Sequence, residues 1–181
     1  MLIRIKKGRD GADTLSCTRP DGSVTWQRVH EFFPLHDLCH VAVETTLGLE
    51  DAFFGLVAQG WDLEDFSAPK ATRKPYPQWT VPFEDVVMFF QSEYRKDVET
   101  PVDEINALFA ALTHPWTITA EQAQEIRLLV RELSRQWEAI SPGDSLEVPF
   151  PYTSQSLTLS RKKKQTRPAH QVCFRKMILC C

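Results

Sequence analysis

The sequence lacks the features that define several large classes of protein. No run of apolar residues approaches the roughly 18 needed for a membrane-spanning helix. Its seven glycines form no phosphate-binding loop, and no nucleophile elbow of a serine hydrolase is present. These absences argue against a membrane protein, an ATPase, a dinucleotide-dependent enzyme and a serine hydrolase.

Cysteine is also scarce, with five residues in 181 and no Cys-x-x-Cys pair. Cys17 and Cys39 stand alone inside predicted elements, and no secretory signal is visible at the N-terminus. We therefore expect reduced thiols and a cytoplasmic protein. Cys39 is expected to be a small core residue.

The charge is distributed unevenly along the chain. The formal net charge is -3, yet no acidic residue follows Glu147, whereas seven lysines or arginines do. We predict one domain over residues 1–152 and a basic, disordered tail over residues 153–181. Nucleic acid is expected to bind only through the tail, and an extension without a role is the other interpretation. The basic residues concerned are Arg161, Lys162, Lys163, Lys164 and Arg167.

The pattern of apolar residues predicts an α+β fold. Alternation and turn residues predict strands over residues 2–6, 14–18 and 24–29, and residues 146–150 can return as a last strand. Helical spacing and capping residues predict about five helices. These cover residues 34–47, 50–59, 84–96, 101–112 and 119–140. We expect a small N-terminal antiparallel sheet covered by these helices in a single domain.

The helix predicted over residues 34–47 carries most of the chemistry. A helix face turned to water normally contains Lys, Arg or Gln, but none occurs from His36 to Leu49. With about 100° per residue, the polar side chains gather in one sector. They are His36, Asp37, His40 and Glu44. This sector consists of residue types that bind metals or transfer protons.

The spacing of the two histidines predicts a metal site. Side chains four residues apart share a helix face, so both imidazoles can bind one divalent ion at about 2.0 to 2.1 Å. The motif His-Asp-Leu-Cys-His resembles the His-Glu-x-x-His helix of zinc-dependent hydrolases, whose acid acts as general base. Asp37 is one methylene shorter than that acid, which leaves a role as base or as hydrogen-bond partner of a histidine open. Candidate ligands are His36, His40 and Glu44, candidate catalytic residues are Asp37 and Glu44, and the expected cofactor is zinc or another divalent metal.

Two further sets of residues can complete such a site. His30 precedes the helix and is a possible ligand, although a single loop histidine is more often exposed. The acidic segment over residues 62–65 can return toward the histidines and supply a carboxylate. Its alternative is a solvated loop with Asp62 as a helix N-cap.

A longer stretch resembles a known group of proteins. The run from Phe32 to Glu44 is followed by Leu-Gly-Leu and Phe-Phe-Gly-Leu-Val-Ala-Gln-Gly-Trp. Over roughly residues 2–66, the chain resembles a group of small bacterial proteins without an assigned activity. The resemblance implies a bacterial, cytoplasmic setting and names no substrate.

Two functions therefore remain open. The first is a divalent-metal protein, with metal-dependent hydrolysis as its chemistry if it is an enzyme. The second is a non-catalytic binding or scaffold protein in which the His/Asp/Glu cluster is a structural polar network. The partner in either case is a small molecule or a protein, and no contact with a membrane is expected.

Overall fold

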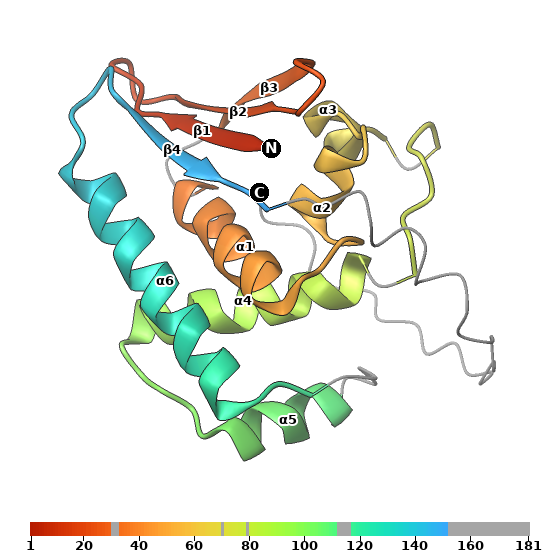
Figure 1. Ribbon diagram of the computed structural model, residues 1–181, viewed down its shortest axis with the longest axis vertical. Coiled ribbons are helices and arrows are strands. Elements are labelled where there is room, and N and C mark those ends of the chain that lie inside the picture. The colour runs from red at the N-terminus through yellow and green to blue at the C-terminus, as the bar shows by residue number, and fades with distance from the viewer. Residues whose placement is uncertain (30–32, 70, 79, 112–116, 152–181) are drawn as a thin grey trace.

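The computed structural model combines one sheet with six helices in the part of the chain that it describes (Figure 1). The described residues are 1–29, 33–69, 71–78, 80–111 and 117–151. The predicted α+β fold in a single domain is confirmed. The predicted tail, with the basic residues assigned there to nucleic acid, lies outside the described residues.

The sheet is antiparallel throughout and has the order β3-β2-β1-β4. Its strands are β1 (Leu2–Lys6), β2 (Asp13–Thr18), β3 (Val24–Val29) and β4 (Ser145–Pro149). The predicted last strand joins the sheet, and its partner, which the sequence did not indicate, is the first strand, so both ends of the domain meet in the sheet. Reciprocal hydrogen bonds between Met1 and Phe150 extend this pairing: the Phe150 N–H donates at 2.8 Å and the Met1 amino group donates at 3.0 Å.

The helices lie on one side of the sheet (Figure 1). They are α1 (Phe33–Leu47), α2 (Phe53–Ala58), α3 (Leu63–Ser67), α4 (Thr80–Lys96), α5 (Val102–Ala111) and α6 (Ala120–Ala139). The additional short helix, α3, forms because Asp62 and Asp65 make a capping box at its N-terminus. Helix α2 begins at Phe53 rather than at Glu50, since the backbone at Ala52 is extended. None of the described helices is both long and apolar enough to span a bilayer.

Helix α1 separates two clusters of core side chains. On one side, Leu38 and Val41 pack with the inner face of the sheet and with α2 and α3. On the other side, Ala42 and Val43 pack with α4, α5 and α6. Cys39 belongs to the second cluster and is fully buried, which confirms the predicted core role. Burial raises the pKa of its thiol to about 12.

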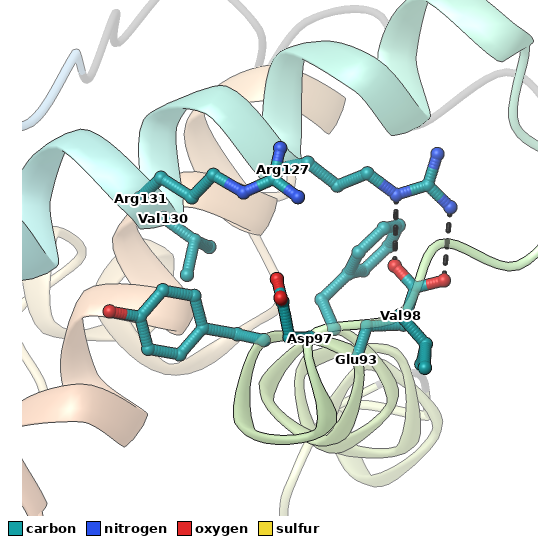
Figure 2. Close-up of a pocket in the computed structure, with 8 residues that line it drawn as sticks. Glu93, Asp97, Val98, Arg127, Val130 and Arg131 are labelled. Carbon is teal, nitrogen blue, oxygen red and sulfur yellow. Dashed lines mark hydrogen bonds and ion pairs between the residues drawn. The ribbon is translucent and has the colours of Figure 1, made fainter.

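A largely buried ion pair joins α4, α6 and the start of α5 at the second cluster. The guanidinium of Arg127 on α6 donates two hydrogen bonds, of 2.9 and 3.0 Å, to the carboxylate of Glu93 on α4 (Figure 2). Arg127 also donates to the carbonyl of Thr100, and the Thr100 N–H donates to Glu93 at 2.6 Å. A cavity of about 50 Å³ beside the pair is lined by α4 and α6. Glu93 therefore links α4 to α6 and to the start of α5.

We expect Glu93→Gln to lower the free energy of unfolding by about 3 kcal/mol, because the buried Arg127 charge then lacks its counter-ion. Glu132→Gln is the matched control, since Glu132 accepts from Arg135 on an exposed surface and should cost less than about 1 kcal/mol. Denaturant unfolding monitored by circular dichroism measures both. Equal losses would contradict the anchoring role of Glu93.

Candidate metal centre

Two histidines on α1 bring their ring nitrogens together. His36 and His40 are one helical turn apart, and their imidazoles meet edge to face with centroids 4.7 Å apart. The two Nε2 atoms are separated by 3.1 Å. The N–H groups of the first helical turn have no intrahelical partner, so a proline is tolerated there. Pro34 therefore does not disturb the turn that carries His36. The predicted pairing of these histidines on one helix face is therefore present.

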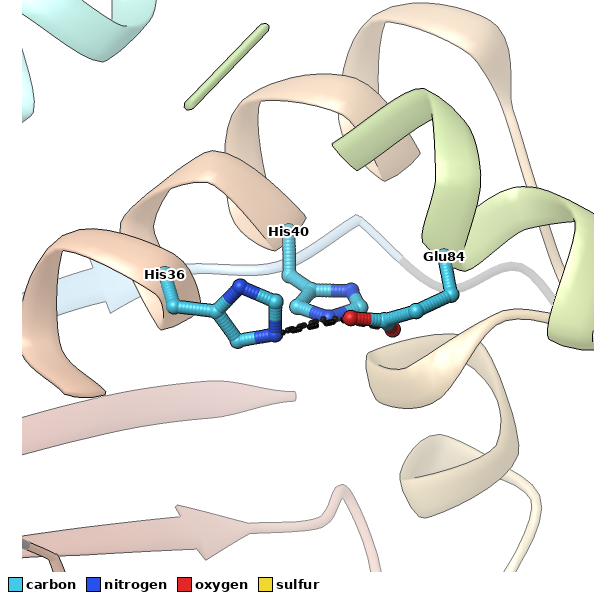
Figure 3. A group of neighbouring side chains, drawn as sticks. All are labelled: His36, His40 and Glu84. Atoms are coloured by element: carbon cyan, nitrogen blue, oxygen red, sulfur yellow. Dashed lines mark hydrogen bonds and ion pairs between the residues drawn. The ribbon is translucent and has the colours of Figure 1, made fainter. Parts of the chain in front are cut away.

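A carboxylate from α4 completes the group. Glu84 places Oε1 at 3.0 Å from the Nε2 of His36 and Oε2 at 3.1 Å from the Nε2 of His40. Figure 3 shows the three side chains pointing toward one another from α1 and α4. One possible ligand atom from each residue lies within 4.8 Å of the others, which is close enough to hold one metal ion. Sequence spacing did not identify Glu84, because it lies 40 residues beyond Glu44.

The far sides of both imidazoles are also fixed. The Nδ1 of His40 donates to Oε1 of Glu44 at 2.9 Å, and the Nδ1 of His36 donates to Oε1 of Gln91 at 3.1 Å. A carboxylate and an amide oxygen can only accept, so each Nδ1 must carry a proton. A neutral imidazole that is protonated at Nδ1 has its lone pair on Nε2. An Nε2 atom of this kind can bind a metal ion, whereas an Nε2 atom that contacts the Glu84 carboxylate directly must donate a proton to it.

Glu44 lies behind His40 rather than among the converging ligand atoms. Its carboxylate accepts the backbone N–H of Phe54 at 3.1 Å and that of Gly55 at 2.9 Å, in addition to the His40 N–H. The first N–H groups of a helix have no intrahelical partners, so the start of α2 supplies donors to this fully buried acid. The arrangement explains how Glu44 is accommodated in the core and why it holds His40 in one orientation.

Gly55 allows the N-terminus of α2 to come close to Glu44 and Glu50. A Cβ atom at position 55 would overlap the backbone carbonyl group of Glu50. The absence of a side chain lets the N-terminus of α2 lie against the chain that precedes it. The N–H of the same residue donates to Glu44.

Opposite charges within the group shift the pKa values of His40 and Glu84. Burial alone would lower the pKa of His40, but the charge of Glu84 and hydrogen bonds to Glu44 and Glu84 raise it to about 10. Burial alone would raise the pKa of Glu84, but the charge of His40 and hydrogen bonds from both histidines hold it well below its usual range. Without a metal ion, a protonated His40 therefore neutralises the Glu84 carboxylate.

Asp37, the predicted acid of the His-Asp-x-x-His motif, is buried on the same helix and is 4% exposed. Its Oδ2 atom has no hydrogen-bond partner within the described part of the chain. Burial raises the pKa of this carboxyl to about 6, against the opposing effect of the charges on His36 and His40. Asp37 is not a member of the group of converging ligand atoms.

The acidic segment over residues 62–65 has other partners. Asp62 caps α3 and forms an ion pair with Arg19, while Asp65 pairs with Lys74 at 2.6 Å. The N-cap interpretation of Asp62 is therefore confirmed, and neither aspartate joins the histidines. His30 lies outside the described residues.

One side of the group is accessible to solvent. The side chain of Glu84 is 44% exposed and that of His36 is 21% exposed, whereas His40 is 4% exposed. The ring of Phe53 lies 5.2 Å from that of His40 and covers part of the buried side. A small molecule can therefore approach from the side of Glu84 and His36.

No family model, curated protein or solved structure matches this chain. The resemblance of residues 2–66 to small bacterial proteins therefore stays a prediction.

We expect Glu44→Gln to lower the free energy of unfolding by about 2 kcal/mol, because an amide cannot accept three N–H donors in the same way and places its own N–H₂ among them. The loss is measured with a chelator present, so that it reports the contacts of Glu44 with α2 and His40 alone. Glu64→Gln, on the exposed face of α3, is the control and should change stability by less than about 0.5 kcal/mol. Thermal and denaturant unfolding report both. An unchanged stability of Glu44→Gln would contradict this role.

Proposed function

We propose that the protein binds a divalent metal ion through His36, His40 and Glu84. Ligands that lie 2.0 to 2.1 Å from one ion are separated from each other by about 2.9 to 3.4 Å in octahedral to tetrahedral geometry. The two Nε2 atoms are 3.1 Å apart, and each lies 3.0 or 3.1 Å from a different oxygen of Glu84, so one ligand atom from each residue lies within 4.8 Å of the others. This convergence of ligand atoms from two helices is the observation that carries the proposal.

The ligand types favour zinc. Two imidazoles and one carboxylate form a set used by catalytic zinc sites, which keep a further position for water or substrate. Calcium and magnesium prefer sets made only of oxygen ligands, so they fit less well. Iron(II) also accepts two histidines and one carboxylate, and it is the competing metal.

Glu44 and Gln91, which are not ligands, support the same proposal because each accepts a hydrogen bond from one of the histidines. Histidines that bind metals usually donate their other ring N–H to a carboxylate or carbonyl oxygen, which orients the ring. His40 has this relation with Glu44, and His36 has it with Gln91. Both Nδ1 atoms are therefore engaged before any ion binds, and a metal ion would take the place of the proton on Nε2 of His40.

Hydrolysis is the chemistry that we propose for the metal-bound protein. A zinc ion with three protein ligands lowers the pKa of a coordinated water, which makes it a nucleophile at neutral pH. The exposed sides of Glu84 and His36 give a substrate access. Asp37 stays the candidate base among the α1 acids, because Glu44 already accepts three hydrogen bonds and Oδ2 of Asp37 has no partner among the described residues.

The alternative is a non-catalytic protein in which the cluster only stabilises the fold. One observation favours it: with His40 protonated, the ionised Glu84 and the hydrogen bonds to Glu44 and Gln91 satisfy the group without a metal ion. The two proposals differ in what removal of a ligand does. Loss of a ligand abolishes metal binding in the first, and only weakens the fold in the second.

We expect untagged protein, purified without chelator, to contain close to one equivalent of zinc or iron. His36→Ala and Glu84→Ala should each lose most of it, because the remaining two ligands bind a divalent ion weakly. Glu104→Ala is a matched control that removes an exposed carboxylate from α5. Elemental analysis of the folded proteins measures the metal. Folded wild-type protein that holds no metal and cannot be loaded would contradict the proposal.

Thermal unfolding separates the two alternatives. For a metal site, zinc at about 100 times its Kd should stabilise the wild type by about 2.7 kcal/mol, and Glu84→Gln should abolish this gain. For a structural network, His36→Ala should lower stability by about 1 to 3 kcal/mol by the same amount with zinc and with chelator. A wild-type midpoint that does not respond to zinc favours the network.

A further inference from the structure

The outer face of the sheet carries a patterned set of side chains. Residues that pair across antiparallel strands point to the same face. The registers Lys6↔Thr14 and Thr14↔Arg28 place two cations on either side of a hydroxyl. The next outward row, two residues along each strand, contains Glu147, Arg4, Ser16 and Trp26, and Glu147 forms an ion pair with Arg4. A basic row therefore lies roughly 7 Å from a row that ends in an aromatic ring.

No described helix covers this face. The helices lie on the opposite side of the sheet, where α1 carries the metal group (Figure 1). Trp26 on β3 is 60% exposed and Val24 on the same strand is 55% exposed. The indole ring therefore faces solvent and is available to a ligand.

A hollow lies beside Trp26 and is mainly cationic. Its volume is about 460 Å³, within the range of pockets that hold small molecules. The charged side chains that line it are Lys6, Lys7, Arg9, Arg28 and Asp10. Four cations therefore meet one carboxylate, in a chain whose formal net charge is -3.

The internal pairs of this face leave its charge available. Arg28 pairs with Asp10, but their side chains are 61% and 67% exposed, and ion pairs as exposed as this one are weak. A ligand phosphate can therefore compete for Arg28. The ammonium of Lys7 donates to the carbonyls of Trp137 and Ile140 at the end of α6, so it is not among the groups assigned to the ligand. Lys6 and Arg9 are exposed and have no ion pair in the described part of the chain.

We propose that this face binds single-stranded nucleic acid. One base stacks on Trp26, and the neighbouring phosphates contact Lys6, Arg9 and Arg28. An open aromatic ring beside a row of cations is the usual chemistry for unpaired nucleotides, because every base has a face that can stack. A duplex hides these faces, so the single strand is the preferred form. This site is independent of the metal group and of the basic tail.

Fluorescence anisotropy of a labelled oligo(dT) of about 12 nucleotides tests the proposal with the full chain. At about 50 mM salt the wild type should bind the single strand, and bind the matching duplex more weakly. Trp26→Thr, which keeps a good strand former, should weaken binding by roughly tenfold or more. Trp26→Phe keeps a ring that can stack and should retain most of the affinity.

The charge contribution has its own matched control. Lys6→Glu and Lys96→Glu change the net charge equally at two exposed lysines, one beside Trp26 and one at the end of α4. Lys6→Glu should weaken binding and reduce the slope of log affinity against log salt by about 0.7, whereas Lys96→Glu should do neither. Circular dichroism and the unfolding midpoint verify that each variant is folded.

A further variant in the full chain replaces residues 161–164 with glutamine and separates this face from the tail. If the sheet face binds, the variant retains binding that depends on Trp26. Binding that is lost in this variant but unchanged by Trp26→Thr and Lys6→Glu would assign it to the tail and overturn the proposal. No binding at low salt, or equal affinity for the duplex, would also overturn it.

Discussion

The buried carboxylate of Glu44 is the constraint on which the candidate metal centre depends. A fully buried acid is accommodated only if hydrogen-bond donors surround it, and here two are backbone N–H groups of α2 and one is the imidazole of His40. The same three contacts therefore join α2 to α1 and orient His40. A substitution of Glu44 therefore changes both the stability of the fold and the orientation of His40.

The position of α1 between two apolar clusters adds a second constraint. Its opposite sides pack against the sheet and against α4 to α6, so rotation of the helix would disrupt both clusters at once. The polar sector is thereby held in a fixed direction, toward the N-terminal part of α4, where Glu84 lies. Close packing of ordinary core residues thus sets the direction of the histidines.

The sequence predicted the parts of the site that lie within one helix. His36 and His40 could be paired from spacing alone, because helix geometry fixes residues that are four apart. Glu84 could not be found in this way, since its position depends on how α4 crosses α1, which no local pattern contains. The same limit applies to Glu44: its place on the helix was predictable, but the N–H donors that turn its carboxylate toward α2 come from a different segment.

The fold was predictable to a similar depth. Alternating residues identified the three N-terminal strands, and a short apolar run after a helix stop indicated a last strand. Its antiparallel pairing with β1 was not indicated by that run. The start of α2 at Phe53 was not anticipated, because acidic residues near a helix start serve equally as caps and as first-turn residues. Helix α3 was anticipated only as an N-cap at Asp62, as one of two interpretations of the acidic segment. The local sequence does not decide between a cap and a first-turn role. The starts of α2 and α3 are therefore set by the tertiary contacts of Ala52 and Asp62.

Gly55 connects these observations to the limits on sequence change. Its lack of a side chain allows close contact with Glu50, and its N–H reaches Glu44, which holds His40. Any larger residue at position 55 would displace the start of α2 and alter the direction of an imidazole to which it is not bonded. The orientation of a candidate metal ligand thus depends on the one residue type that contributes no side chain.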